Sequence, residues 1–444
     1  MLVLNGLDDV LDGKLELDCP SMTWSQGAES LSGAGYIRQA TGGGFEFALF
    51  SATRGDHASW FEQEVAAARV PAGTLLPRDS GGELRAIDVT GQEWTAEGLR
   101  PQRTVSQHQS LRGTARELRT SETAPEGAGC VVEVRIAGRV RFPGNVPSHV
   151  ETSVGGQVVG WSIGPAVADV QLEGAKLQAR ELSGGTSFML LSDRPLRMDA
   201  ELRLLDAVTF LENSVVPWSS LSRWQDGRAQ FRVRGERYVP SPRFALPPLP
   251  ERDRDSGAFW RLVASLVGRS ADTESQLRVW IVVAATAATW PLESRGLVTA
   301  VAVEAVAKLL LPGYVPDLAG YSTADEEQAR KLIASADLPE RLASRLLGVL
   351  KRQGASASDR LFELARLGVV DPQEVDAWKA LRNSIAHGAL PPMGQELVDK
   401  VHRVRTLFSR LVLSVVGYEG PYVDYGCTGW PVRDHSSSAL KARE

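Results

Sequence analysis

A proline-rich stretch near the middle of this chain separates two segments of different character, and this change limits the fold to at least two parts. The stretch contains Pro240, Pro242 and the run Pro247-Pro248-Leu249-Pro250, and the charged residues 251–255 follow it. Proline stiffens a connection without forming regular structure, so residues 241–256 are predicted to be a linker. With 444 residues, the chain is long enough for a separate hydrophobic core on each side.

Short β-prone segments alternate with glycine-rich turns before the linker. In residues 131–136, apolar side chains alternate with Glu133 and Arg135, the period of two that is typical of half-buried strands. One helix is predicted over residues 199–213, where leucine and valine recur every three positions after Asp199. Residues 1–240 are therefore predicted to form a β-rich sandwich or barrel, as one domain or two. The expected strands cover residues 14–17, 44–50, 130–142, 158–163, 168–172, 187–191 and 229–233.

Helix signals replace strand signals after the linker. The clearest start is Asp371-Pro372-Gln373-Glu374, with an acidic N-cap, proline at the first helical position and glutamate at the third. Short connections between helices favour an antiparallel helical bundle over residues 257–444. The predicted fold class is thus α+β in two domains. The expected helices cover residues 257–267, 272–289, 291–311, a segment opening at 323, and 337–352, 358–367, 371–387 and 395–416.

The charge is distributed unevenly between the two halves. The formal net charge is −5, but residues 251–444 carry 24 Lys and Arg against 24 Asp and Glu, so the deficit lies in residues 1–250. Neither half has the strongly basic field of a general nucleic-acid coating protein. An RNA partner would therefore be recognised by its shape or by a local patch of charge.

The sequence offers no sign of a membrane or secreted protein. No apolar run approaches the roughly 20 residues that a membrane helix needs. The first residues lack the basic start and the apolar core of a secretory signal. The three cysteines are widely separated, which predicts neither a disulfide framework nor a cysteine metal cluster. We expect a cytoplasmic protein.

Residues 381–388, Leu-Arg-Asn-Ser-Ile-Ala-His-Gly, hold the most promising chemistry. Arg382 carries a permanent charge that can bind a phosphate. His387 can accept or donate a proton near neutral pH. Asn383 offers both a hydrogen-bond donor and an acceptor to orient either of them. Held together, these three side chains are enough to cleave RNA without a metal.

Helical phasing gives this motif two sides. At about 100° per residue, Trp378, Leu381 and Ile385 share one side, which is expected to face the core. Asn383 and His387 are four residues apart and lie together on the opposite side, with the arginine between the two stripes. The plain structural alternative stays open: a histidine before a C-cap glycine often bonds the free carbonyls, and polar residues on a helix face are often only solvated.

With this motif in its helical setting, residues 257 to about 425 resemble the HEPN superfamily (higher eukaryote and prokaryote nucleotide-binding domains). These are all-α bundles whose signature is an arginine, often a polar residue after it, and a histidine after four to six intervening positions. Here Arg382 and Asn383 are followed by His387, with four residues between arginine and histidine. A β-rich region ahead of such a domain resembles the ApeA-like anti-phage proteins, in architecture alone.

The resemblance implies a metal-independent endoribonuclease that needs no cofactor and works as a homodimer, with two copies of the motif facing each other. It implies that Arg382 stabilises the charge that develops on the scissile phosphate. His387 would transfer protons and Asn383 would orient one of the two. The nucleophile would be the 2′-hydroxyl of the RNA, leaving a 2′,3′-cyclic phosphate. Because several members have lost activity, the alternative is a non-catalytic module that dimerises or binds nucleotides or RNA with a partner protein.

Further residues are weaker candidates. Lys400, Arg403 and Arg405 make the helix after the motif locally basic and could follow an RNA backbone, although a solvated outer face explains them as well. Tyr422 could stack on a base or pack against the bundle. Glu304 lies in the middle of a predicted helix and could pair with the motif arginine, or be exposed.

The predicted architecture suggests a role in prokaryotic defence against phage, with abortive infection as the outcome. The helical domain would cleave host or phage RNA, with structured RNA such as tRNA as the guess that the family suggests. The β-rich domain would recruit the substrate or act as a sensor that restrains the nuclease until a phage-derived trigger binds.

Overall fold

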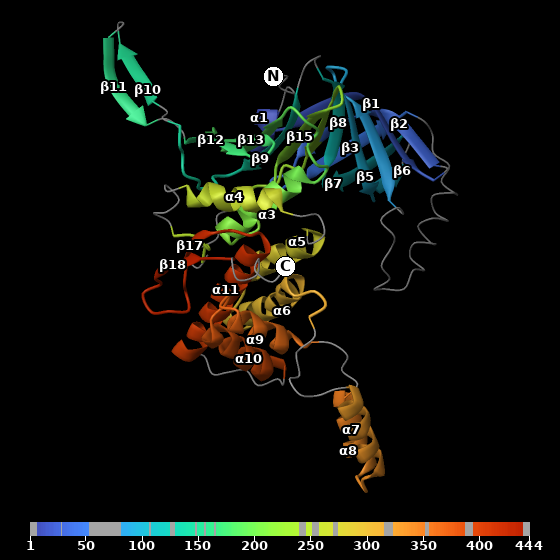
Figure 1. Ribbon diagram of the computed structural model, residues 1–444. Coiled ribbons are helices and arrows are strands. Elements are labelled where there is room, and N and C mark those ends of the chain that lie inside the picture. Colours follow the sequence, from blue (N-terminus) through green and yellow to red (C-terminus); the bar gives the residue numbers. More distant parts are fainter. Residues whose placement is uncertain are drawn as a thin grey trace. The chain divides into compact units, whose positions relative to one another are not determined.

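The computed structural model divides the chain into two compact units (Figure 1). One unit contains residues Met1–Val208 and Val216–Pro240, and the other contains Thr209–Val215 and Ser241–Glu444. The first is rich in strands and the second in helices, which confirms the predicted two-part α+β layout. The residues described are 7–27, 29–52, 81–105, 108–124, 129–146, 149–154, 157–163, 166–238, 246–250, 257–269, 274–314, 323–350, 355–386 and 394–437.

An antiparallel sheet of 14 strands forms the first unit, in the order β12-β13-β14-β9-β15-β16-β8-β5-β4-β1-β2-β3-β7-β6. A separate hairpin pairs β10 with β11. The strands are β1 (Glu16–Gln26), β2 (Glu29–Gln39), β3 (Phe45–Ser51), β4 (Gly82–Ile87), β5 (Glu93–Leu99), β6 (Gln102–Val105), β7 (Gln109–Ala115), β8 (Leu118–Thr123), β9 (Cys130–Ala137), β10 (His149–Val154), β11 (Gln157–Ile163), β12 (Val167–Leu172), β13 (Ala175–Leu182), β14 (Gly185–Ser192), β15 (Ser220–Gln225) and β16 (Arg228–Val233).

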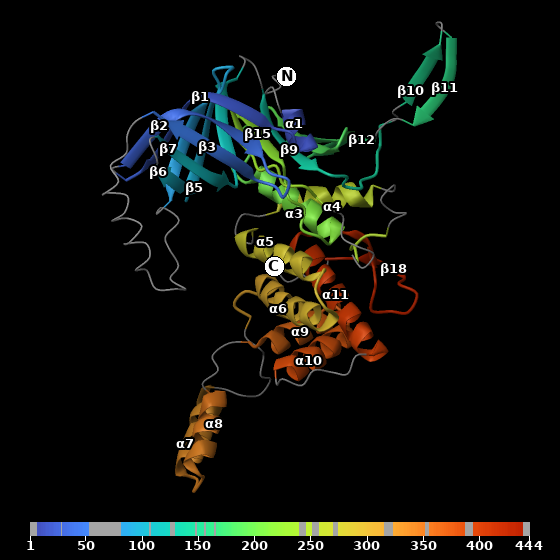
Figure 2. The ribbon, with the colours of Figure 1, turned by 180° about the vertical axis from the view of Figure 1, so that it is seen from behind.

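The large sheet curls around its own core, as Figure 1 and Figure 2 show from opposite sides. Strands β5 and β7 contact each other although four strands separate them in the sheet order. One cluster of buried side chains fills the curl, including Trp94 of β5, Leu111 of β7 and Phe231 of β16. The expected sandwich or barrel thus takes the form of one continuous curled sheet, which ends at β12 and β6.

Two helices accompany the strands in the part of the first unit that the structure describes. The predicted helix over residues 199–213 is present as α3 (Ala200–Glu212), and Asp199 just before it accepts a hydrogen bond from Arg203 Nε at 2.9 Å. A short helix, α1 (Leu7–Asp12), was not predicted.

All eight helices expected after the linker are present, with ends that differ by a few residues. They are α4 (Ala258–Gly268), α5 (Glu274–Ala287), α6 (Leu292–Leu310), α7 (Thr323–Ser335), α8 (Glu340–Leu350), α9 (Ala357–Arg366), α10 (Pro372–Ala386) and α11 (Gln395–Val415). Helix α6 contacts α5, α9, α10 and α11, while α7 and α8 pair with each other. A hairpin of β17 (Gly420–Val423) and β18 (Val432–His435) was not predicted.

The middle of the predicted linker is packed into the helical unit. Leu249 is buried, and the carbonyl oxygen of Pro248 accepts a hydrogen bond from the Val423 amide at 2.9 Å. The Tyr425 hydroxyl donates to the carbonyl oxygen of Pro247 at 2.7 Å. Residues 246–250 are therefore part of this unit, which corrects the prediction that 241–256 serve only as a connection.

Across the described ranges, no helix has both the length and the apolar content of a membrane-spanning segment.

Candidate active site in the helical unit

The helix that carries the motif begins as predicted. Asp371 Oδ1 accepts a hydrogen bond from the Gln373 amide at 2.8 Å, and the Asp371 amide donates to Glu374 Oε2 at 3.1 Å. These two bonds satisfy backbone donors that the first turn of a helix leaves without partners. The start of α10, and hence the phase of every residue on it, is fixed by its own sequence.

The apolar side of α10 faces the core, as predicted. Trp378 and Leu381 are buried, and Trp378 Nε1 donates to the carbonyl oxygen of Ala300 on α6 at 3.0 Å. The helices approach closely at Gly296 of α6, where an added Cβ would lie 3.0 Å from Leu381 Cδ2 and 2.9 Å from Val401 Cγ2. A larger residue at position 296 would require the side chains of Leu381 and Val401 to move.

Arg382 is held by a carboxylate from the neighbouring helix. Its Nε donates to Glu304 Oε1 of α6 at 2.7 Å, and the side chains are 35% and 30% exposed. The anticipated pairing of Glu304 with Arg382 is therefore present. Within the described ranges Arg382 makes no second hydrogen bond, so its two Nη groups are available to a ligand from solution.

The rest of the motif is described in part. Asn383 is exposed, as its position opposite Trp378 and Leu381 predicts. His387 and the side chain of Ile385 lie outside the described residues. The placement of the histidine relative to Arg382 thus stays a prediction from helical spacing.

Two of the predicted RNA-binding residues lie on α11 and are partly exposed to solvent. Lys400 is 30% exposed, and its Nζ contacts Glu396 Oε1 at 2.6 Å, which lowers the pKa of that carboxyl group. Arg403 is half-buried, and its Nε donates to the carbonyl oxygen of Gly426 at 3.3 Å. Both cations could reach a phosphate, but Lys400 would have to exchange its present partner.

The other two predicted RNA-binding residues lie inside the unit. Arg405 is 7% exposed, and its guanidinium carbon lies 5.4 Å from the ring centre of Phe408. Tyr422 is 3% exposed and packs beneath Arg410, and burial raises the pKa of its hydroxyl to about 12. The prediction that Arg405 and Tyr422 contact RNA is corrected accordingly, because packing rather than solvent surrounds both.

A buried polar cluster near β18 was not anticipated. Arg410 Nη1 lies 3.2 Å from both carboxylate oxygens of Glu374. His435 Nε2 lies 3.2 Å from Ser414 Oγ, and burial together with the nearby Arg410 lowers the pKa of this imidazole to about 4. Glu374 was assigned only a capping role from sequence, since nothing in its spacing indicates a partner on α11.

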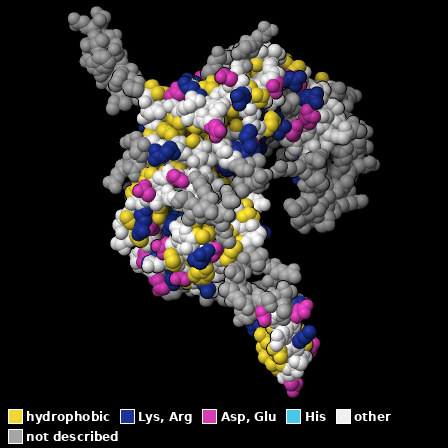
Figure 3. All heavy atoms as spheres, viewed as in Figure 1, with side chains coloured by type: hydrophobic (Ala, Val, Ile, Leu, Met, Phe, Trp, Pro, Cys, Tyr) yellow, Lys and Arg dark blue, Asp and Glu magenta, His cyan; other side chains and the backbone are white. Residues whose placement is uncertain are grey.

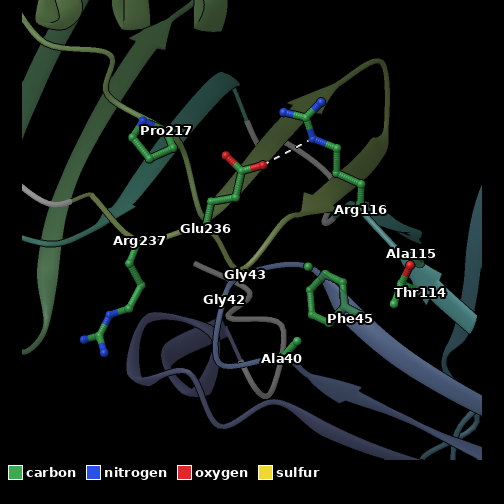
Figure 4. A pocket seen from close by; sticks show the side chains of 11 residues that line it. Ala40, Gly42, Gly43, Phe45, Thr114, Ala115, Arg116, Pro217, Glu236 and Arg237 are labelled. Carbon is green, nitrogen blue, oxygen red and sulfur yellow. Dashed lines mark hydrogen bonds and ion pairs between the residues drawn. The ribbon is translucent and has the colours of Figure 1, made fainter. Parts of the chain in front are cut away.

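A hollow beside the glycine-rich turn at residues 42–44 belongs to the first unit (Figure 4). It has a volume of about 490 Å³ and opens beside the β2–β3 turn at residues 42–44. Arg116 and Glu236 form an ion pair at 3.3 Å on its wall, and the Arg237 side chain extends away from that pair. The hollow could accept a polar ligand of moderate size.

Over the ranges given above, the structure brings no three histidine, cysteine, aspartate or glutamate side chains together in an arrangement that could hold a metal ion.

Comparisons with protein-family models, with curated proteins and with solved structures found no match. The expectation of a HEPN domain therefore depends on Arg382, Asn383 and His387 and on the helical bundle that carries them.

Proposed function

We propose that the helical unit is a HEPN-type endoribonuclease and that Arg382, Asn383 and His387 form its catalytic group. The observation that carries this proposal is the contact between Arg382 and Glu304. It holds an arginine that is about one-third exposed beside the exposed Asn383, on the last two turns of a helix whose other side is buried. A histidine one residue beyond this helix would complete a general acid–base site.

The proposed reaction is transesterification within the RNA. A base removes the proton of a 2′-hydroxyl, whose oxygen forms a bond to the adjacent phosphorus. The bond from phosphorus to the 5′-oxygen breaks, and that oxygen takes up a proton. The products are a 2′,3′-cyclic phosphate and a 5′-hydroxyl end. His387 moves protons in this scheme, and Arg382 stabilises the charge that grows on the phosphate oxygens.

Glu304 gives the arginine its direction. A guanidinium group has donors in a fixed planar fork, so a carboxylate on Nε leaves the Nη pair free to bind two phosphate oxygens. We propose Glu304 as a positioning residue with this effect. Its carboxylate also offsets the charge of Arg382 before RNA binds.

The proposed substrate is a structured RNA, with tRNA as the first candidate, bound by a homodimer. Lys400 and Arg403 are the described cations proposed to hold the RNA backbone. Basic and acidic side chains are interspersed on the face in Figure 3, which favours a local patch over a broad electrostatic field. A second protomer would supply the other copy of the motif.

The proposed biological role is cytoplasmic defence of a prokaryote against phage, with growth arrest as its outcome. The β-rich unit would sense a phage-derived trigger, and the hollow beside residues 42–44 is the place in that unit where a ligand could be received. Removal of residues 1–245 tests this control: toxicity unchanged by the deletion would contradict it.

The same ion pair supports a second candidate function. Arg382 and Glu304 connect α10 to α6, so the pair could serve only to join two helices of a non-catalytic module. Such a module would dimerise, or bind nucleotides or RNA, and act through a partner protein. The two candidates differ in what the loss of Arg382 would change.

Arg382→Ala and His387→Ala, made separately, distinguish them. Under the nuclease proposal each variant loses about 10² to 10⁴-fold of RNA cleavage in EDTA, while the dimer and the Tm stay close to those of the wild-type protein. Arg366→Ala is the matched control. It also removes an arginine that pairs with a glutamate, but Arg366 and Glu363 both lie on α9, away from the motif helix in sequence. Absence of cleavage by the wild-type protein, with a lowered Tm in the variants, would favour the non-catalytic module.

A further inference from the structure

A small cavity lies among three helices of the helical unit, and none of the motif residues lines it. Its volume is about 10 Å³, room for a single particle of the size of a water molecule. Most of its wall comes from α5, α6 and α11. It is lined by Asn213, Leu246, Ala284, Ala288, Arg295, Thr299, Val401 and Arg405.

Two arginines in this wall have unused donors. The Nε atoms of Arg295 and Arg405 are both buried, and neither has a hydrogen-bond partner in the part of the chain that the structure describes. Their remaining contacts are long: Arg405 Nη2 lies 3.5 Å from the carbonyl oxygen of Leu246, and Arg295 Nη1 lies 3.5 Å from that of Ala288. Among the residues that the structure describes, neither arginine forms an ion pair with a carboxylate.

Two buried arginines without a carboxylate partner are unusual. A buried charge normally has a partner of opposite charge, because its removal from water costs several kcal/mol. Here burial lowers the pKa of Arg295 and, with Arg295 nearby, lowers the pKa of Arg405 to about 10. Burial and Arg295 also lower the pKa of His402, against the opposing effect of Asp399. Positive charge is therefore concentrated around the cavity, and no carboxylate of the described residues pairs with either guanidinium group.

We infer that this cavity binds one small inorganic anion of the size of chloride, held between Arg295 and Arg405. The two Nε–H groups supply its hydrogen bonds, and the two guanidinium charges offset its own. A phosphate or sulfate is excluded by the volume. The hydroxyl of Thr299 is already engaged, since it donates to the carbonyl oxygen of Arg295 at 2.8 Å. This site is separate from the proposed nuclease chemistry and does not depend on it.

The site predicts that chloride stabilises the folded protein. The Tm of the full-length chain would be measured from 1 to 300 mM chloride, with gluconate added to keep the ionic strength constant. We expect a saturating rise on the order of 5 °C, because a ligand that binds only the folded state shifts unfolding by mass action. Bromide should act in the same way, whereas gluconate is too large to enter.

Arg405→Met should abolish the dependence on chloride, and Arg403→Met, two residues away on the same helix and outside the cavity wall, should retain it. Crystals grown in bromide give a second measurement that does not depend on the variants folding. An anomalous peak between Arg295 and Arg405 would support the site. Equal Tm values in chloride and gluconate, with no such peak, would show that the cavity holds only a buried water and would overturn the inference.

Discussion

Arg382 at the end of α10 and Arg410 on α11 each pair with a glutamate, yet the two pairs differ in what they can do. Arg382 and Glu304 are about one-third exposed, and among the described residues the guanidinium group makes no other hydrogen bond. Arg410 and Glu374 are 14% and 6% exposed, and Arg410 bridges both carboxylate oxygens. Arg382 can therefore bind a ligand from solution, whereas the pair of Arg410 and Glu374 is buried and contributes to the stability of the fold.

Solvent exposure also determines how much each ion pair contributes to the stability of the protein. A partly exposed ion pair contributes about 0–1 kcal/mol to stability, because water competes with it. Removing one partner of a buried pair costs about 3–5 kcal/mol, since the other charge is left without compensation. Loss of the exposed pair should therefore appear in activity, and loss of the buried pair in stability.

The largest effect on stability is expected for Arg410→Met. Glu374 would remain buried without its partner, and the free energy of unfolding should fall by about 3–5 kcal/mol. Urea unfolding monitored by circular dichroism would measure it. The double variant Glu374→Gln with Arg410→Met should regain part of the loss, whereas a loss below 1 kcal/mol for Arg410→Met alone would contradict the comparison.

His435 makes the buried region sensitive to acid. Its pKa is about 4 in the folded protein, against 6.5 for an unperturbed imidazole. A group with a lowered folded pKa contributes stability that is complete above the unfolded pKa and is lost as the pH falls, here from 6.5 to about 4. The loss should be about 3 kcal/mol. Unfolding of wild-type and His435→Gln protein would be measured across this pH range. Burial raises the pKa of Glu374 to about 7, so this carboxyl group titrates in both proteins and its effect cancels in the difference. The same pH dependence of the unfolding free energy in both proteins would contradict the role of His435.

Glu304→Gln tests the exposed pair. Without the carboxylate, Arg382 loses its orientation, and RNA cleavage should fall about 10-fold, equivalent to about 1.4 kcal/mol. The stability should change by less than about 1 kcal/mol. Cleavage rates and Tm values from one preparation give both quantities. A large fall in Tm would instead make Glu304 a structural connection between α6 and α10.

The smallest effect is expected for Lys400→Ala. If Lys400 contacts one phosphate, the slope of log Kd against log salt concentration should decrease by about 1, equally for all RNA sequences. Arg405→Met provides the comparison, because its buried charge should leave that slope unchanged. An equal change in both variants would mean that α11 does not present Lys400 to the RNA.

The helices could be predicted from sequence better than the strands, for local physical reasons. The start of helix α10 could be predicted because Asp371 is a typical N-cap residue and Pro372 suits the first helical position. Strand β2 was not among the predicted strands. It contains Gly33 and Gly35, and a Cβ at either position would collide with a carbonyl oxygen of β3. Glycine is needed there because two backbones approach closely, and that approach depends on a strand further along the chain.

The candidate site shows the same limit. Spacing along one helix placed Trp378 and Leu381 in the core and Asn383 on the surface. It could not decide between a paired and an exposed Glu304, which lies 78 residues from Arg382. Spacing also could not show that Arg405 is buried, because it does not indicate which neighbouring segments cover that side of α11. The pairing of Glu304 and the burial of Arg405 both depend on contacts between segments far apart in the sequence.

The most direct test of the central claim is the chemistry of the RNA ends. Wild-type protein and the His387→Ala variant would be expressed, and the new RNA ends sequenced by a method that separates 2′,3′-cyclic phosphates from 3′-hydroxyls. The nuclease proposal predicts cyclic phosphate ends, paired with 5′-hydroxyl ends, from the wild-type protein alone. New 3′-hydroxyl ends, or the same ends from the His387→Ala variant, would contradict it.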